Sequence, residues 1–313
     1  MKILLAEYAM GIGLEGTLLL EGRAMINTLA DSFQRLGHEV TYLTAGSTIK
    51  SGKTIHSDEN SFESVLAKTA KINDAALVIG PDELLGDLTD IIEKNTVNLG
   101  CPAESVRICA DKLECTKMLQ AESISVPLTI PERKDEDFDG KFVRKPRFGC
   151  ASEGVRISSG CSQANNGEEY ILTEYIEGEH LSVSLVCGQK TLLLSLNRQL
   201  IDIKESNNDT IFEYKGNQIP YRADYQEEIF ETAIKTVDVL GCSGLVGIDV
   251  IYGDKPYVID VNPRPTTAIF GLVKTLNCEI GELLLKNMFG TLPDSVSLEG
   301  ECSFTKDDIE DII

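Results

Sequence analysis

The sequence is poor in positive charge. Its 313 residues include 29 lysine and arginine residues against 50 aspartate and glutamate residues, which gives a formal net charge of −21. Nucleic acids and anionic membranes bind to basic surfaces, so this charge excludes both as the expected partner. A single nucleotide remains compatible with it, because a few local cations or a metal ion can hold the phosphates.

Long apolar runs and metal-binding spacings are also missing. No window approaches the roughly 18 apolar residues of a membrane span, and Met1–Tyr8 is interrupted by Glu7 too early for a secretory signal. We therefore expect a cytoplasmic protein. The three histidines have no zinc-site spacing, and none of the nine cysteines forms a CxxC pair, so we expect buried free thiols. Cys150 is the exception to this expectation, because it falls in a glycine-bearing loop.

The remaining composition is that of a globular protein, with 42% hydrophobic and 25% charged residues. The first hundred residues alternate strand signals (2–8, 39–43, 75–79, 96–99) with helix signals (21–36, 62–71, 84–94). This alternation predicts a small doubly wound parallel-sheet domain over residues 1–100. After a helix at 105–121 the strands follow one another across turns, which predicts antiparallel sheet. We divide this part near residue 172, into 101–172 and 173–313.

A glycine motif follows the first predicted strand. Gly11, Gly13 and Gly16 spell GIGLEG, a match to the dinucleotide-binding GxGxxG. In that motif the third glycine lies inside the helix that receives the pyrophosphate, whereas the pattern here starts the helix at Glu21. The second strand also lacks an acidic residue for the ribose. A structural turn or a substrate-facing loop is favoured, and a nicotinamide-dependent oxidoreductase is the alternative.

A second glycine loop lies in the segment KFVRKPRFGCASEGVRI, residues 141–157. A strand that carries Lys145 is followed by a loop in which Gly149 and Gly154 bracket small residues, and then by another strand. Small residues let backbone N–H groups approach a phosphate chain, and the lysine supplies a positive charge. Taken alone, the segment fits an ordinary hairpin equally well.

The segment LTEYIEGEHLSV, residues 172–183, reads as a strand that ends at Glu174-Tyr175-Ile176, a turn at Gly178, and a second strand. Backbone groups at such a crossover can pair with the edge of an adenine, and a nearby acid can hold ribose hydroxyls. Half-buried strands flanked by glutamates are common, so this segment alone is weak evidence.

A predicted hairpin over Gly247–Pro265 carries the strongest signal. Side chains alternate along a strand, so Asp260 and Asn262 share one face. An even-numbered loop places Asp249 on that face too, and a four-residue loop sets it opposite Asp260. The other face is apolar and consists of Ile248, Val250, Ile259 and Val261. Two carboxylates and an amide oxygen suit Mg²⁺, whereas the alternative is a merely solvated face.

In this order and spacing, these segments and the helix that begins at Asp111-Lys112 resemble an ATP-grasp enzyme of the carboxylate–amine ligase class. The resemblance covers about residues 100–290, and residues 1–100 match the doubly wound domain that usually precedes this fold. It implies a combined α/β and α+β architecture, in which two α+β subdomains clamp ATP.

The resemblance also implies roles for individual residues. The ATP-binding residues would be Lys112 and Lys145 at the phosphates, the flap residues Gly149, Ala151, Ser152 and Gly154, and the adenine hinge Glu174, Tyr175 and Ile176. Either Glu179 or His180 would meet the ribose, and we favour Glu179. Asp249, Asp260 and Asn262 would bind Mg²⁺ or Mn²⁺, although the family usually has glutamate where this chain has Asp260. The catalytic residues would be Arg264, beside the transferred phosphate, and Arg198, near the acyl-phosphate.

Three further stretches resemble an archaeal branch of the family: the first strand with residues 21–25, Leu196–Leu200, and Asn262–Thr267 (NPRPTT). That branch includes the enzyme that joins L-glutamate to tyramine in methanofuran biosynthesis. The resemblance therefore implies amide formation through an acyl-phosphate with release of ADP and phosphate. It implies small amino acid and amine substrates and allows a homodimer. A ligase for another amino acid and amine, or an inactive nucleotide-binding protein, is the alternative.

Overall fold

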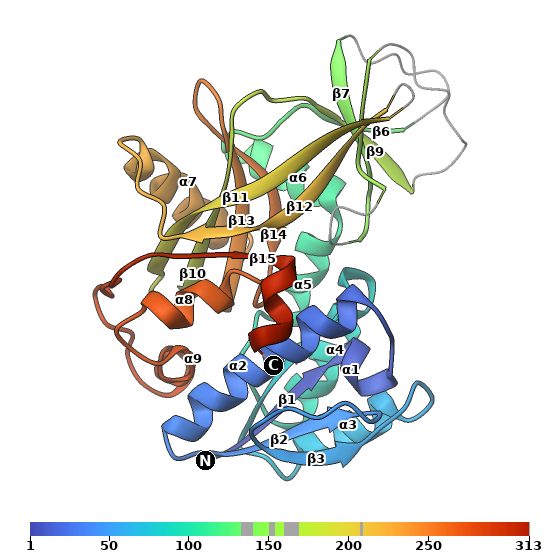
Figure 1. The fold of residues 1–313 in the computed structure, drawn as a ribbon, viewed down its shortest axis with the longest axis vertical. Coiled ribbons are helices and arrows are strands. Elements are labelled where there is room, and N and C mark those ends of the chain that lie inside the picture. Colours follow the sequence, from blue (N-terminus) through green and yellow to red (C-terminus); the bar gives the residue numbers. More distant parts are fainter. Residues whose placement is uncertain (133–139, 150–153, 160–168, 207–208, 313) are drawn as a thin grey trace.

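The computed structural model describes residues 1–132, 140–149, 154–159, 169–206 and 209–312, and its strands form two sheets (Figure 1). The first sheet is parallel, as predicted, and its strand order is β3-β2-β1-β4-β5. Its strands are β1 (Lys2–Glu7), β2 (Glu39–Thr44), β3 (Lys53–His56), β4 (Ala75–Ile79) and β5 (Val97–Asn98). Its helices are α1 (Tyr8–Ile12), α2 (Thr17–Arg35), α3 (Phe62–Ala70) and α4 (Asp82–Asn95). The pattern missed β3, because all four of its residues are exposed and show no apolar alternation.

The GIGLEG segment has a structural role in this sheet. Gly11 lies inside α1, where a Cβ atom would come within 2.1 Å of the Phe62 ring, and Gly13 ends that helix with a φ of +80°. The predicted helix start at Glu21 is wrong: α2 begins at Thr17, directly after Gly16. The first turn of α2 carries three consecutive leucines, of which Leu18 is exposed and Leu19 and Leu20 are partly buried, so they do not show the spacing of a buried helix face.

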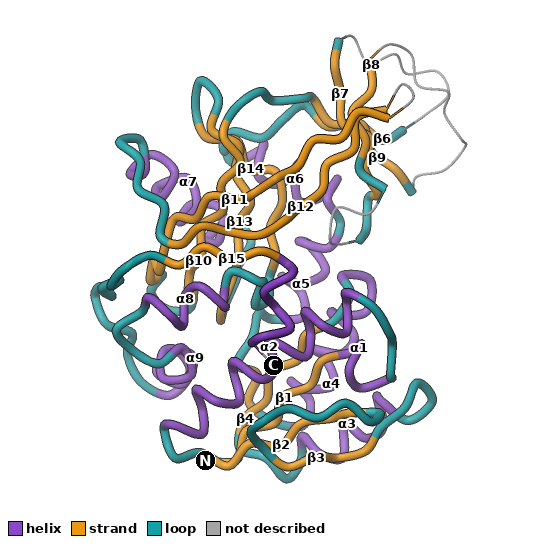
Figure 2. The backbone as a smooth tube through the Cα atoms, in the orientation of Figure 1, coloured by secondary structure: helices purple, strands orange, loops and turns teal. Residues whose placement is uncertain are grey.

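The second sheet has ten strands in the order β14-β13-β10-β11-β12-β8-β7-β9-β6, with β15 paired to β12. All of its pairings are antiparallel, as predicted. Figure 2 shows β11 and β12 running as one long ribbon between its two ends. The strands are β6 (Thr129–Pro131), β7 (Lys141–Pro146), β8 (Arg156–Ser159), β9 (Tyr170–Glu174), β10 (Glu179–Cys187), β11 (Leu192–Ser206), β12 (Asp209–Ile219), β13 (Gly244–Tyr252), β14 (Pro256–Asn262) and β15 (Cys302–Thr305).

The helix predicted over 105–121 is two helices, α5 (Ala103–Ala110) and α6 (Lys112–Ala121). They are separated at Asp111, whose extended backbone and side chain cap α6 through the N–H groups of Leu113 and Glu114. Arg147, which follows β7, donates to the same carboxylate at 2.6 and 2.7 Å. This break fixes Lys112 at the first position of α6.

Four more helical segments complete the fold: α7 (Gln226–Val239), α8 (Ile269–Thr275), α9 (Ile280–Phe289) and the 3-10 helix η1 (Lys306–Ile312). One face of the second sheet packs against α7, through residues such as Leu181, Val250 and Ala233. A separate core joins Leu245 of β13 to α2, α8 and α9. Each core also includes residues of the first sheet, so the two sheets share both cores.

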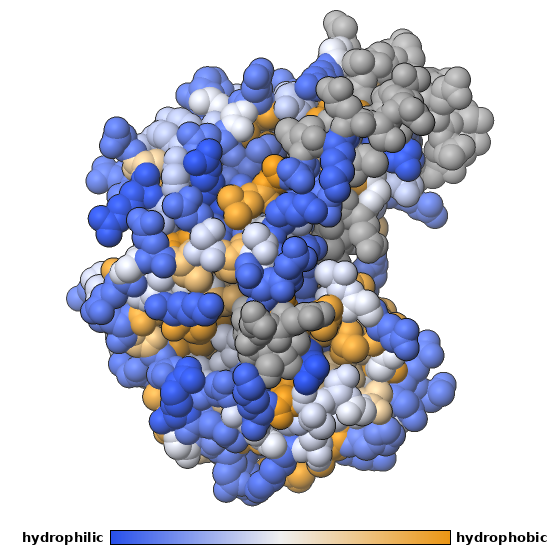
Figure 3. All heavy atoms as spheres, in the orientation of Figure 1, coloured by the Kyte–Doolittle hydropathy of each residue, from blue (hydrophilic) through white to orange (hydrophobic). Residues whose placement is uncertain are grey.

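The polar surface (Figure 3) and the free, mostly buried cysteines are those expected from the composition. Hydrophilic side chains cover most of the face seen in Figure 3. The seven described cysteines are free and five of them are buried, as expected, whereas Cys150 lies outside the described residues. Within the described part of the chain, no helix has the length and hydrophobicity needed to cross a bilayer.

Candidate active site

The predicted carboxylate pair lies on neighbouring strands. Asp249 of β13 is paired with Asp260 of β14, and the Asn262 amide approaches the Asp249 carboxylate at 3.5 Å. The predicted register is right, but its cause differs. The turn has three residues, 253–255, and a β-bulge beyond Asp249 adds one residue to β14. The bulge restores the pairing that the four-residue loop was expected to give.

The bulge also changes which side chains of β14 are buried. Val258 is 3% exposed and packs in the core, whereas Ile259, predicted on the apolar face, is only partly buried. The carbonyl oxygen of Ile259 accepts a hydrogen bond of 3.0 Å from Nζ of Lys145. The bulge therefore directs a backbone acceptor toward the lysine of β7.

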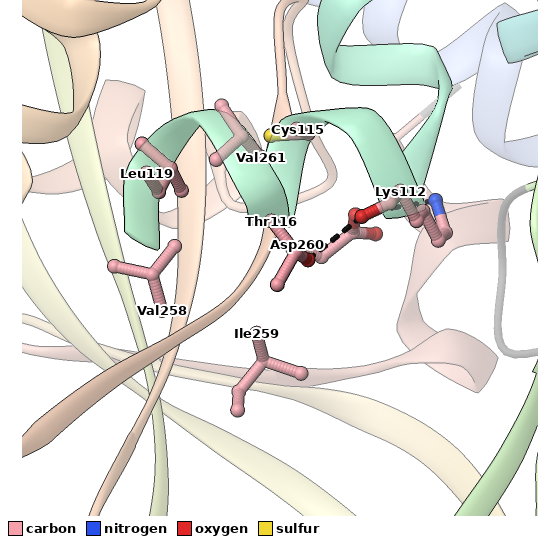
Figure 4. A pocket seen from close by; sticks show the side chains of 8 residues that line it. All are labelled: Lys112, Cys115, Thr116, Leu119, Val258, Ile259, Asp260 and Val261. Atoms are coloured by element: carbon pink, nitrogen blue, oxygen red, sulfur yellow. Dashed lines mark hydrogen bonds and ion pairs between the residues drawn. The ribbon is translucent and has the colours of Figure 1, made fainter. Parts of the chain in front are cut away.

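Both predicted phosphate lysines lie at this edge of the sheet. Nζ of Lys112 is 3.2 Å from Oδ1 of Asp260 and 3.5 Å from Oδ2 of Asp82. Figure 4 shows Lys112 of α6 beside Asp260 of β14 in the lining of a small pocket between these two elements. The side chains of Lys112 and Lys145 are about nine-tenths buried, so both positive charges are held in fixed places.

The neighbouring charges shift the two carboxylates in opposite directions. Burial and the charge of Asp260 raise the pKa of Asp249 to about 7. Burial opposes the ionisation of Asp260 too, but the charges of Lys112, Lys145 and Arg264 outweigh it and hold its pKa below the ordinary value. Burial and the charge of Lys112 lower the pKa of Lys145. The site thus concentrates charges of both signs at low exposure.

Three site residues were missed by the sequence reasoning. Asp82 begins α4 after β4, the neighbour of the central strand β1, is largely buried, and its Oδ1 lies 3.9 Å from Nε of Arg264. Glu7 ends β1, is 6% exposed, and caps α1 through the N–H groups of Ala9 and Met10. The available signal was position, because ligand sites of doubly wound sheets lie at the carboxyl ends of the strands. The third is Gln199, which donates to Asp249 at 2.9 Å.

The predicted catalytic residue Arg198 does not face Asp249 and Asp260. Arg198 is paired with Leu181 and lies over the Tyr221 ring, on the face that α7 covers. Gln199, its neighbour, faces Asp249 instead, because side chains alternate along β11. Arg198 therefore lies on the face of β11 opposite Gln199 and Asp249, and its role near the acyl-phosphate stays a prediction.

The same alternation separates the two residues considered for the ribose, Glu179 and His180. Glu179 accepts a hydrogen bond of 2.9 Å from Tyr221, on the α7 face. His180 and Ser182 lie on the other face, and Ser182 is paired with Asp249. His180 thus shares the face of Asp249 and Glu179 does not, which favours His180, and the ribose contact stays a prediction.

The hinge and the flap are described in part. Tyr175 donates its N–H to the Lys141 carbonyl at 3.1 Å, which ties the hinge to β7, and the Glu174 carboxylate accepts from the N–H of Leu128. Ile176 is partly buried. Gly149 and Gly154 have φ values of +125° and +72°, which favour glycine. Cys150, Ala151 and Ser152 lie outside the described residues.

Asp249, Asp260 and Asn262 are the residues that could hold a divalent cation here. The described residues contain no group of three or more His, Cys, Asp or Glu side chains arranged for a metal. Two carboxylates and one amide instead fit an ion that takes its other ligands from water and substrate phosphates, as Mg²⁺ does. The neighbouring Arg264 is nine-tenths buried and its Nε has no hydrogen-bond partner among the described residues, so it can accept an anion.

Comparison with known proteins agrees with this geometry. The ATP-grasp domain family model matches residues 109–268. The chain is 35% identical to a tyramine–L-glutamate ligase of Methanocaldococcus fervens, over 91% of the chain and 93% of that protein. It is 34% identical to the tyramine–L-glutamate ligase of Methanocaldococcus jannaschii, over 91% and 88%.

A solved structure agrees as well. An ATP-grasp superfamily protein from Archaeoglobus fulgidus superposes with a TM-score of 0.76 at 29% identity, over 97% of this chain and 98% of that one. The ATP-grasp resemblance seen in the sequence and the combined α/β and α+β fold are therefore confirmed. The chain belongs to the ATP-grasp family of ATP-dependent ligases.

Proposed function

We propose that this protein joins the γ-carboxylate of L-glutamate to the amine of tyramine, with ATP converted to ADP and phosphate, as a step of methanofuran biosynthesis. The observation that carries the proposal is the similarity to two tyramine–L-glutamate ligases over 91% of the chain. The convergence of Lys112, Lys145, Asp249, Asp260 and Arg264 at one edge of the sheet supports it.

The proposed reaction has two transfers and no covalent bond to the enzyme. A γ-carboxylate oxygen of glutamate attacks the γ-phosphorus of ATP, and the bond to the β-phosphate oxygen breaks to leave ADP and an acyl-phosphate. The neutral amine then attacks the acyl carbon, phosphate leaves, and the amine proton passes to solvent. Such chemistry depends on positioning and charge neutralisation.

The residues of this chain have separate parts in that proposal. Lys112 and Lys145 hold the phosphate chain. The side chain of Arg264 donates hydrogen bonds to the γ-carboxylate of glutamate and to the oxygens of the transferred phosphoryl group. Asp249, Asp260 and Asn262 hold Mg²⁺ or Mn²⁺, which neutralises phosphate charge when bound. We prefer Mg²⁺, because carboxylates combined with substrate phosphates are its usual ligands. Asp82 orients Lys112 and Arg264 through its charge.

The rest of the ATP is assigned to the neighbouring elements. The backbone at Glu174–Ile176 meets the adenine edge, and His180 lies on the face where the ribose would pass. Gly149 and Gly154, which bound the glycine loop between β7 and β8, are assigned to the phosphates on the family resemblance. The opposing dinucleotide reading loses support, since Gly11 is packed against Phe62 in a helix.

A substrate panel tests the proposal directly. Release of ADP and phosphate is measured with ATP, Mg²⁺, L-glutamate and tyramine, and with each component omitted in turn. We expect product only when all are present. AMP and pyrophosphate would contradict the acyl-phosphate route. Turnover with a different amine and not with tyramine would reject the proposed amine, and no turnover with any pair would support an inactive nucleotide-binding protein.

A further inference from the structure

A second polar cluster lies beside the metal carboxylates and has no part in the proposed handling of ATP. We call it the Glu21 cluster. Its members come from α2, β12, the end of the NPRPTT segment and the start of η1, and they are Glu21, Tyr214, Asn217, Thr267 and Lys306. Figure 1 shows the C-terminal helical segment between α2 and the second sheet, so distant parts of the chain meet here.

Two buried oxygens of this cluster have unused acceptor capacity. Oε1 of Glu21 is paired with the Lys306 ammonium, whose Nζ lies 3.0 Å away, and it accepts no other contact from the described residues. Oδ1 of Asn217, a residue that is 3% exposed, has no partner among the described residues either. Buried polar atoms are normally satisfied, and an unsatisfied one costs about 1–3 kcal/mol. Oδ1 of Asn217 is such an atom, and Oε1 of Glu21 can accept a second hydrogen bond beside Lys306, so one ligand donor would satisfy both.

The cluster is connected to the chemistry by direct contacts. The Asn217 amide donates to the Tyr214 hydroxyl at 2.8 Å, and that hydroxyl lies 2.9 Å from the Thr267 hydroxyl. Asn217 is also paired in register with Gln199, which donates to Asp249. Besides burial, the charges of Glu21 and Asp249 both raise the pKa of Tyr214, so the hydroxyl lies in the field of both carboxylates.

The pairing of β15 with β12 holds Lys306 close to β12. Strand β15 pairs with β12 and sets Thr305 opposite Gly216, so Lys306 follows at the edge of the cluster. A Cβ atom at Gly216 would lie 1.9 Å from the Phe304 carbonyl oxygen, and only glycine permits this approach. The Lys306 side chain is 29% exposed, which leaves its ammonium accessible to a ligand.

A carboxylate with a free acceptor beside an accessible ammonium is complementary to a zwitterion. We infer that the Glu21 cluster binds the α-amino and α-carboxylate groups of the amino acid substrate: Glu21 and Asn217 accept from its ammonium, and Lys306 donates to its α-carboxylate. This rests on the proposed function for the identity of the amino acid, L-glutamate. Its γ-carboxylate then extends toward Arg264, which leaves tyramine to be bound elsewhere.

Single substitutions separate this role from ATP binding. In Glu21→Gln and Lys306→Met we expect the KM for L-glutamate to rise about 10- to 100-fold, the loss of one hydrogen bond to a charged group. The KM values for ATP and tyramine should stay within about twofold. Lys286→Met is the matched control, since it removes an exposed ion pair with Glu282 on α9. It should leave all three KM values unchanged.

Two analogues of glutamate test which group each residue binds. Glutarate lacks the α-amino group and 4-aminobutyrate lacks the α-carboxylate, while both keep the reacting carboxylate. Glu21→Gln should lose the preference for glutamate over glutarate, and Lys306→Met the preference for glutamate over 4-aminobutyrate. If the Glu21–Lys306 ion pair only holds η1 against α2, both substitutions should lower the melting temperature without changing either substrate preference. This outcome would overturn the inference.

Calorimetric titration of L-glutamate in the presence of Mg²⁺ and ADP separates this inference from the proposed function. Binding by the wild type without turnover of tyramine would reject the proposed amine alone. Unchanged glutamate affinity in both folded variants would overturn the inference while the ligase stands. Failure of the wild type to bind glutamate, or a rise in the KM for tyramine in place of glutamate, would also overturn it.

Discussion

At the scale of single residues, the site is a balance of buried charges. Asp260 is flanked by Lys112, Lys145 and Arg264, and it stays ionised although it is buried. Asp249 lacks such close cations, so its burial and the charge of Asp260 dominate. A divalent cation between the two would relieve that repulsion. The fixed cations of the site thus keep Asp260 ionised but do not do the same for Asp249.

Asp260→Asn tests this arrangement. The amide keeps the shape and loses the charge that faces Lys112, so we expect ADP release to fall at least about 100-fold. Steady-state ADP release with saturating substrates is the measurement. Asp254→Asn, in the exposed turn of the same hairpin, is the control and should retain activity. An active Asp260→Asn protein would show that the metal site lies elsewhere.

Glu7 gives stability a pH dependence. Burial raises its pKa to about 7, against the lowering effects of the Met10 and Ala9 N–H groups and the charge of Arg264. The folded protein therefore holds this proton more tightly than the unfolded chain does. The corresponding stability is fully present below about pH 4.5 and is lost as the pH rises through about 7.

The comparison with Glu7→Gln isolates this contribution. Between pH 5 and pH 8 the wild type should lose up to about 3 kcal/mol of unfolding free energy relative to the variant. Urea denaturation of both proteins at four pH values measures it, and the charge of the remaining carboxylates cancels in the difference. Parallel pH profiles would show that Glu7 ionises normally in the folded protein.

At the scale of elements, close backbone approaches set the positions of the edge strands. Gly216 lets β15 pair with β12, and Gly216→Ala would force its Cβ against the Phe304 carbonyl group. We expect a loss of about 1–3 kcal/mol in unfolding free energy, measured by urea denaturation. Gly46→Ala is the control, because a Cβ there meets nothing within 4 Å. Equal stability of the two variants would mean that β15 detaches without cost.

The hairpin shows how one extra residue affects the chemistry. With the bulge in β14, Asp249 and Asp260 remain paired, while the Ile259 carbonyl becomes an acceptor for Lys145. A regular hairpin with the same three-residue turn would place Asp260 on the opposite face, because a shift of one residue inverts a strand. The bulge is therefore part of the site.

At the scale of the whole molecule, both cores are shared between the two sheets, so ligand binding should stabilise the protein as a unit. Mg²⁺ with ATP should raise the melting temperature, by an amount equivalent to about 2.7 kcal/mol when the ligand is at 100 times its Kd. EDTA should remove most of this rise, and NAD(H) should give none. Differential scanning calorimetry measures it, and stabilisation by NAD(H) would revive the oxidoreductase alternative.

Local pattern was sufficient for much of this fold. The alternation of strands and helices predicted the parallel sheet, and the period of two along β13 and β14 predicted that Asp249, Asp260 and Asn262 share a face. These features depend on neighbours in sequence, or on one hairpin, so the sequence encodes them directly. The segment boundaries were less accurate at α2 and Asp111, where exposed turns and a helix cap replace apolar spacing.

By itself, then, the sequence determined the class of sheet, the hairpin that pairs Asp249 with Asp260, and the family. Only the tertiary structure brought Asp82 and Glu7 to Arg264, set Gln199 and His180 on the metal face in place of Arg198 and Glu179, and joined Glu21 to Lys306. The physical reason is that these contacts join segments up to 285 residues apart, from Glu21 to Lys306. Their distances follow from strand order, register and packing, which local residue preferences do not encode.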